Sequence, residues 1–142
     1  MTNQHQDCDY ISHDNGIHEF INHAATRQAV DILLEKVFEI VSALAANEPL
    51  LVLNDLTESG IPPLRYAMSR SKELVKHYYD GTPTQQNPVL MAYVVQSNSM
   101  VSTFKFLIEQ LGRGTTTIKI FNDRESAMAW LVSQQVEKSR SV

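Results

Sequence analysis

Three small polar residues, Ser97, Asn98 and Ser99, stand where a helix is expected to begin, directly after an apolar segment. The backbone N–H groups of a first helical turn have no partner within the helix, so this place could receive an anion. The side chain of Ser97 or Ser99 could equally satisfy those groups as a helix cap. No glycine-rich phosphate loop accompanies them, which argues against nucleotide binding through a standard motif.

His13, His18 and His23 recur at intervals of five residues, a spacing that raises the question of a metal site. Along a strand, however, this spacing places successive side chains on opposite faces. Cysteines and carboxylates do not cluster around them at ligand spacing. We therefore expect no metal, and we expect His13 and His18 to be exposed beside a turn.

The sequence gives nucleophilic catalysis little support. Cys8 is the only cysteine, which excludes an internal disulfide, and no Gly-x-Ser-x-Gly elbow is present. His77 is the only histidine beyond His23 and is expected near a helix C-terminus, away from the loops that could hold a ligand. We expect a protein without catalytic activity and without a cofactor. A hydrolase with an unrecognised serine, histidine and carboxylate arrangement is the least favoured alternative.

Hydrophobic periodicity and turn residues predict the elements that would position these side chains. Residues 8–22 predict a β-hairpin around Asn15-Gly16, a pair typical of a type I′ turn. Apolar side chains with the helical period predict a helix behind a Thr26 N-cap. Helices are expected at residues 26–46, 62–79, about 99–111, and from Asn122 onward, with Glu125 in a capping-box-like place. Strands are expected at residues 50–53, 89–95 and 116–121.

Strands that alternate with amphipathic helices predict an α/β fold. We expect a mixed, mainly parallel sheet with an N-terminal antiparallel hairpin and about four helices. The 142 residues suit one domain, with an ordered core at about 8–135 and frayed termini, including residues 137–142. In such sheets, ligands bind beyond the carboxyl ends of the strands, at a topological switch point. The loops expected there are residues 54–61, 96–99 and 122–123.

The predicted helices have distinct inner and outer faces. In the first, acidic residues spaced by four are expected to form a solvated stripe: Asp31, Glu35 and Glu39. In the second, the expected inner face comprises Leu64, Ala67, Met68, Ser71, Leu74, Val75 and Tyr78. Its expected outer face is basic and comprises Arg65, Lys72 and Lys76, with Arg70 nearby. Met68 and Met91 are predicted core residues.

The net charge of −4 is unevenly distributed, because residues 1–58 carry ten acids and two bases, whereas residues 59–142 carry ten bases and six acids. An acidic protein lacks the cations that neutralise phosphates, which argues against nucleic-acid binding. The polar, acidic N-terminus argues against a secretory signal. No apolar run approaches the roughly 20 residues of a membrane span. We therefore expect a cytoplasmic protein with no nucleic-acid partner and no integral membrane association.

One segment, IKIFNDRESAMAWLV at residues 118–132, resembles the ending of stand-alone bacterial STAS-like proteins, which are related to sulfate-transporter and anti-sigma-factor-antagonist domains. The residues that carry the resemblance are Phe121, Asp123, Glu125, Ala127, Trp130 and Leu131. The start of the second helix after Gly60, Ile61, Pro62 and Pro63 is similar, as is the order of elements. The resemblance covers about residues 8–135 and implies a STAS-like fold, related to CRAL-TRIO-type folds.

The resemblance implies a non-catalytic regulatory or protein-interaction module, sometimes switched by phosphorylation, or a binder of small ligands. Anti-sigma-factor antagonists of this type carry Asp-Ser-x-Gly before a helix, and Glu58-Ser59-Gly60 stands in about that place. The candidate loop therefore comprises Asp55, Thr57 and Ser59. Three departures favour an ordinary turn residue at Ser59: a glutamate replaces the aspartate, one residue is missing before the glycine, and two prolines follow.

The sequence thus favours a cytoplasmic STAS-like module that acts on a protein partner, which could be a second copy of the chain. The loops around Asp55–Ser59 and Ser97–Ser99 would carry the interaction. The alternative is a binding protein for a lipid or an anionic metabolite. A sizeable apolar pocket would favour the lipid, and converging N–H groups would favour the anion.

Overall fold

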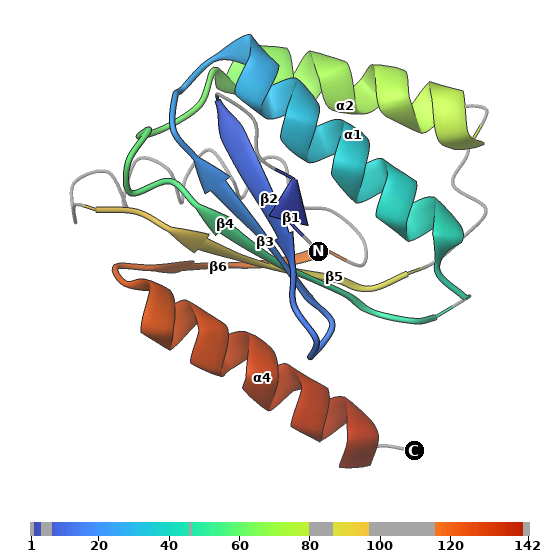
Figure 1. Ribbon diagram of the computed structural model, residues 1–142. Coiled ribbons are helices and arrows are strands. Elements are labelled where there is room, and N and C mark those ends of the chain that lie inside the picture. Colours follow the sequence, from blue (N-terminus) through green and yellow to red (C-terminus); the bar gives the residue numbers. More distant parts are fainter. Residues whose placement is uncertain (1, 4–6, 46, 80–86, 97–115, 141–142) are drawn as a thin grey trace.

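The computed structural model describes residues 2–3, 7–45, 47–79, 87–96 and 116–140, and it has the predicted α/β architecture (Figure 1). The strands are β1 (Thr2–Asn3), β2 (Cys8–Ser12), β3 (Ile17–Asn22), β4 (Leu50–Asp55), β5 (Val89–Val94) and β6 (Thr116–Phe121). The helices are α1 (Arg27–Ala43), α2 (Leu64–Tyr79) and α4 (Arg124–Arg140). The predicted helix at about 99–111 and the predicted loop Ser97, Asn98, Ser99 lie outside the described residues.

The strands form one mixed sheet in which spatial order follows chain order, β1 to β6. The pairs β1–β2 and β2–β3 are antiparallel, and β3, β4, β5 and β6 are parallel. Successive right-handed crossovers in one direction put α1 and α2 on the same face of the sheet, and α4 lies on the opposite face (Figure 1). The described strands follow one another in chain order, so the sheet has no topological switch point among them.

The predicted hairpin is confirmed, but its turn is not of type I′. A type I′ turn needs a positive φ at both central residues, and only Gly16 has one, at 86°. The backbone N–H of Gly16 donates to His13, and that of His13 donates to Ile17. This is the pattern of a three-residue loop in which a glycine adopts the left-handed conformation after a tight turn. The Asn15 side chain accepts a hydrogen bond from the Ile17 backbone. The residue with the left-handed backbone conformation in this loop is Gly16, not Asn15.

Side-chain caps define where two helices begin. The Thr26 hydroxyl accepts a hydrogen bond from the backbone of Ala29 at 3.1 Å, which confirms the predicted N-cap of α1. For α4, the cap is Asp123 rather than Asn122, because its carboxylate accepts from the Ser126 backbone at 2.7 Å. Beyond the ordered core expected at about 8–135, the structure describes β1, which pairs with β2, and α4, which continues to Arg140.

Each face of the sheet contributes one layer of the hydrophobic core. Between the sheet and α1, the buried side chains include Tyr10, Phe20, Leu33, Val37 and Val52. Between the sheet and α4, they include Ile17, Leu51, Leu53, Val94 and Leu131. Among the described residues, no helix is long and apolar enough to span a membrane.

A polar contact joins α1 to α2. The Arg70 guanidinium lies 3.1 Å from an Asp31 carboxylate oxygen and 3.2 Å from one of Glu35, and the Tyr66 hydroxyl also donates to Asp31. The expected acidic stripe of α1 is therefore solvated only in part, because two of its members face a basic residue of the neighbouring helix.

Candidate functional site

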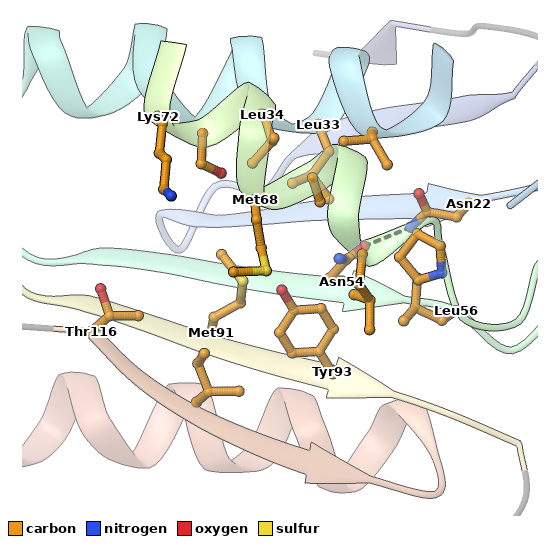
Figure 2. Close-up of a pocket in the computed structure, with 16 residues that line it drawn as sticks. Asn22, Leu33, Leu34, Asn54, Leu56, Met68, Lys72, Met91, Tyr93 and Thr116 are labelled. Carbon is orange, nitrogen blue, oxygen red and sulfur yellow. Dashed lines mark hydrogen bonds between the residues drawn. The ribbon is translucent and has the colours of Figure 1, made fainter. Parts of the chain in front are cut away.

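A cavity of about 530 Å³ lies between α2 and the sheet, within the size range of small-molecule sites (Figure 2). Its wall is mostly apolar, and includes Leu33, Leu34, Leu64, Met68, Met91 and Ile118. Met68 was expected in the core, but 39% of its surface is exposed. It lines the cavity instead of closing against the sheet, which leaves space beneath α2.

A row of polar side chains crosses the sheet at one part of this wall. Asn22 ends β3, and its side-chain amide donates to the Asn54 carbonyl oxygen at 2.5 Å and to the Asp55 backbone at 3.1 Å. Asn54 is the registered neighbour of Tyr93 on β5 and forms a hydrogen bond with its hydroxyl group. Figure 2 shows the Tyr93 hydroxyl directed upward from the sheet toward Met68.

Burial is the largest influence on the pKa of Tyr93 in this row. It raises the pKa of Tyr93 to about 12, and the hydrogen bond with Asn54 only partly offsets it. Tyr93 is therefore a neutral hydroxyl at any physiological pH. The row presents neutral amide and hydroxyl groups, which are suited to hydrogen bonding and not to charge neutralisation.

The opposite part of the wall contains a cation. Lys72, on α2, lines the cavity together with Ser71 and with Thr116, the first residue of β6. Figure 2 shows the Lys72 ammonium directed from the helix toward the sheet. Lys72 was expected on an outer, solvated face of α2, and it is exposed there, although it also lines the cavity.

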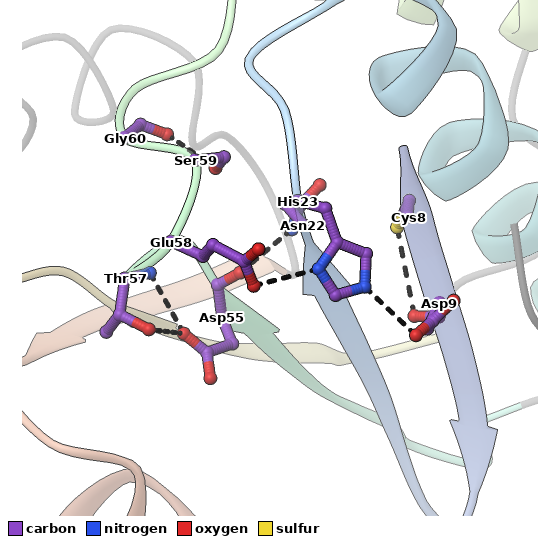
Figure 3. Close-up of polar contacts among 9 residues, drawn as sticks. All are labelled: Cys8, Asp9, Asn22, His23, Asp55, Thr57, Glu58, Ser59 and Gly60. Atoms are coloured by element: carbon purple, nitrogen blue, oxygen red, sulfur yellow. Dashed lines mark hydrogen bonds and ion pairs between the residues drawn. The ribbon is translucent and has the colours of Figure 1, made fainter. Parts of the chain in front are cut away.

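The predicted loop Asp55, Thr57, Ser59 follows β4, but its three side chains do not form one site (Figure 3). The Asp55 carboxylate accepts hydrogen bonds from the backbone and the hydroxyl of Thr57, at 2.9 and 2.7 Å. The Ser59 hydroxyl donates to the backbone oxygen of Gly60, which has a φ of 79°. The loop does reach the cavity, since Leu56 and Pro62 line it.

His23 connects this loop to the N-terminal hairpin (Figure 3). One ring nitrogen lies 2.8 Å from a Glu58 carboxylate oxygen, and the other lies 2.9 Å from one of Asp9. Both nitrogens must carry a proton to donate to two carboxylates, so the arrangement favours the imidazolium form. The hydrogen bonds with Asp9 and then Glu58 raise the pKa of His23, although burial opposes them.

This arrangement predicts a pH-dependent contribution to stability. The folded-state pKa of His23 is raised above its ordinary value of 6.5, so the contribution is complete below that value. It is lost as the pH rises through the folded-state pKa. We expect the unfolding free energy to fall by up to about 1 kcal/mol more in the wild type than in His23→Gln between pH 5.5 and 8.5. Urea titrations at both values measure this, and equal pH dependence in the two proteins would contradict it.

His13 and His18 also have individual partners, and both are half-buried, which corrects the expectation that they are exposed. His13 lies 2.8 Å from a Glu19 carboxylate oxygen, and His18 lies 2.6 Å from the Tyr10 hydroxyl. Burial first, and the charge of Lys36 second, lower the pKa of His18. In the described part of the chain, no three histidine, cysteine, aspartate or glutamate side chains come together as a metal site.

The remaining candidates for chemistry lie away from the cavity. Cys8 is buried beside the core, and burial raises the pKa of its thiol to about 12, which makes it a poor nucleophile. His77 is in the last turn of α2, as expected, and does not line the cavity.

Sequence reasoning placed Asn54 in a loop expected at the ligand-binding edge and Lys72 on a basic face of α2, but it did not bring them together with Asn22 in one cavity. A usable signal existed for Asn22 and Asn54, because they are the last residue of β3 and the penultimate residue of β4, and the carboxyl ends of parallel strands meet at one edge of a sheet. For Lys72 there was no such signal. Comparison with known proteins adds nothing here: no family model, no curated protein and no solved structure matches the chain.

Proposed function

We propose that the protein binds a small, largely apolar ligand in the cavity between α2 and the sheet. The observation that carries this proposal is a cavity of about 530 Å³ with a mostly apolar wall and a few polar groups. Burial of apolar surface stabilises a bound ligand by about 25 cal/mol for each Å². The neutral groups of Asn54 and Tyr93 would orient the ligand by hydrogen bonding.

The proposal favours a binding protein over an enzyme. The described groups around the cavity are amides, hydroxyls and one ammonium, and they include neither a carboxylate nor a histidine that could act as a general base. Retention of a ligand needs no such group. The absence of catalysis is thus part of what we propose for this site.

A fluorescent apolar probe tests the proposal. Nile red is expected to bind the wild type saturably, with one molecule for each chain. Ala67→Trp places an indole on α2 at a position that lines the cavity, and is expected to weaken binding at least about tenfold because the space is filled. Arg65→Trp, which adds the same ring at an exposed position of the same helix, is the matched control.

Fluorescence titration with circular dichroism on each variant supplies the measurement. Equal affinity in the wild type and a folded Ala67→Trp would contradict the proposal, as would probe binding that does not saturate. Native mass spectrometry of protein purified without detergent then identifies any molecule that the chain retains.

A STAS-like regulatory or protein-interaction module is a second proposal. It is supported by the position of Ser59 in a loop whose Leu56 and Pro62 line the cavity. A phosphate on Ser59 would add negative charge beside Asp55 and Glu58 and would change the electrostatic potential of that loop. The same mass spectrum tests this: a phosphorylated Ser59 or a stoichiometric protein partner supports it. An unmodified chain without a partner counts against it.

A further inference from the structure

Lys72 differs from the other residues that line the cavity. Among the described lining residues it is the only one with a charged side chain, and the lining includes neither an aspartate nor a glutamate. Lys72 therefore gives the described lining a positive charge, at a position on α2 that is also exposed to solvent.

Lys72 does not share the ion-pair network that Arg70, a neighbouring cation of α2, forms. Arg70, two residues earlier, bonds to Asp31, Glu35 and Glu73. None of the described carboxylates forms an ion pair with Lys72, and its ammonium is directed toward the sheet in Figure 2. The flexible lysine stem can follow the apolar wall while its ammonium meets a ligand.

The polar groups of the cavity therefore differ in kind. Asn22, Asn54 and Tyr93 are neutral and occupy the wall near the carboxyl ends of β3, β4 and β5. Lys72, Ser71 and Thr116 lie where β6 begins, near the amino ends of the parallel strands. A ligand that spans this wall meets a cation at one end, an apolar middle, and hydrogen-bonding groups at the other end.

Resting on the proposed function, we propose that the ligand is an anionic amphiphile, a chain or ring system with one carboxylate that pairs with Lys72. The ammonium donates hydrogen bonds to the carboxylate oxygens, and the Ser71 and Thr116 hydroxyls lie in the same part of the wall. The apolar body lies against Met68, Met91 and Ile118. Decanoate has this chemistry, and 1-decanol has the same chain without the charge.

Displacement of Nile red by decanoate and by 1-decanol at pH 7.5 tests this inference. The wild type is expected to bind decanoate at least tenfold more tightly than 1-decanol, because the alcohol lacks the charge-assisted hydrogen bond. Lys72→Met keeps an unbranched apolar side chain and removes the charge. It is expected to weaken decanoate binding about tenfold and to leave 1-decanol binding unchanged.

Two further variants and one further ligand sharpen the test. Lys72→Arg restores the charge and is expected to recover most of the preference for decanoate. Lys76→Met removes an exposed cation one turn further along α2, outside the cavity lining, and is expected to change neither affinity. Acetate, the anionic group without the chain, is expected not to displace Nile red.

The outcomes separate this inference from the proposed function. If 1-decanol binds as tightly as decanoate, or Lys72→Met leaves decanoate binding unchanged, the pairing with Lys72 is wrong and the apolar site stands. If decanoate, 1-decanol and Nile red all fail to bind, the proposed function itself is wrong. Displacement of Nile red by acetate, which has no apolar chain, would show an anion site that does not need the apolar wall.

Discussion

Replacement of Arg124 by methionine is expected to lower the free energy of unfolding by about 3–5 kcal/mol. Only 1% of the Glu19 side chain is exposed, and both of its carboxylate oxygens bind the Arg124 guanidinium, at 2.6 and 2.8 Å. Methionine retains the apolar stem and removes both hydrogen bonds. Among its described partners, the buried Glu19 carboxylate then keeps only the hydrogen bond with His13.

The same substitution is expected to reverse the sign of a pH effect. Burial would raise the pKa of Glu19, but Arg124 and His13 together outweigh it and hold the pKa below its ordinary value of 4.5. In the wild type, this stabilisation is present above 4.5 and is lost as the pH falls through the folded-state pKa. In Arg124→Met, burial dominates and raises the pKa. The variant therefore recovers part of its deficit as the pH falls through that raised value.

Urea denaturation at pH 7 and pH 5 measures both effects. Arg65→Met removes an exposed guanidinium from α2 and is expected to change stability by less than about 0.5 kcal/mol. If Arg124→Met matches this control at pH 7, or if its deficit grows on acidification, the account of the Glu19–Arg124 pair is wrong.

The second large effect is expected in the polar row of the cavity wall. Asn54→Leu retains the approximate shape of a buried side chain and removes the hydrogen-bond partner of Asn22 and Tyr93. A buried polar group left without its partner costs about 1–3 kcal/mol, so we expect a loss of about 2 kcal/mol. Asn22→Leu is expected to cost a similar amount, since it also removes the bond to the Asp55 backbone.

A double-mutant cycle distinguishes this bond from general loss of packing. The double variant with leucine at both Asn22 and Asn54 is expected to be less destabilised than the two losses added together, by about 1 kcal/mol. Gln28→Leu, at an exposed position of α1, combined with Asn54→Leu serves as the control and should be additive within about 0.5 kcal/mol. Additivity of the Asn22 and Asn54 losses would contradict the proposed coupling.

The elements of this fold were predictable because their signals are local. Thr26 followed by apolar residues at helical spacing marks the start of α1 from a short stretch of sequence. The uninterrupted apolar run at residues 50–53 predicts a strand covered on both faces, and β4 has that environment. The STAS-like resemblance stays a prediction, because the order of elements supports a fold class and not a family.

Residues whose role depends on distant partners could not be predicted in this way. Glu19 lies between His18 and Phe20 in the hairpin, and nothing in that local sequence indicates its partner Arg124, which is 105 residues away. For Lys72, periodicity gives its direction around the helix axis and agrees with its exposure, but it does not show that the side chain also borders a cavity. The same limitation hid the cavity, because its wall combines residues of α1, α2 and four strands.

The position of α4 has a consequence for how the chain folds. Among the described elements, one helix alone covers the second face of the sheet, and it follows every strand in the chain (Figure 1). In a nascent chain that has already formed its strands, no described helix covers Ile17, Leu51, Leu53 and Val94, and the Glu19 carboxylate still lacks Arg124. Such a face favours aggregation. During synthesis, the arrival of Arg124 and Leu131 would be the step that ends this exposure.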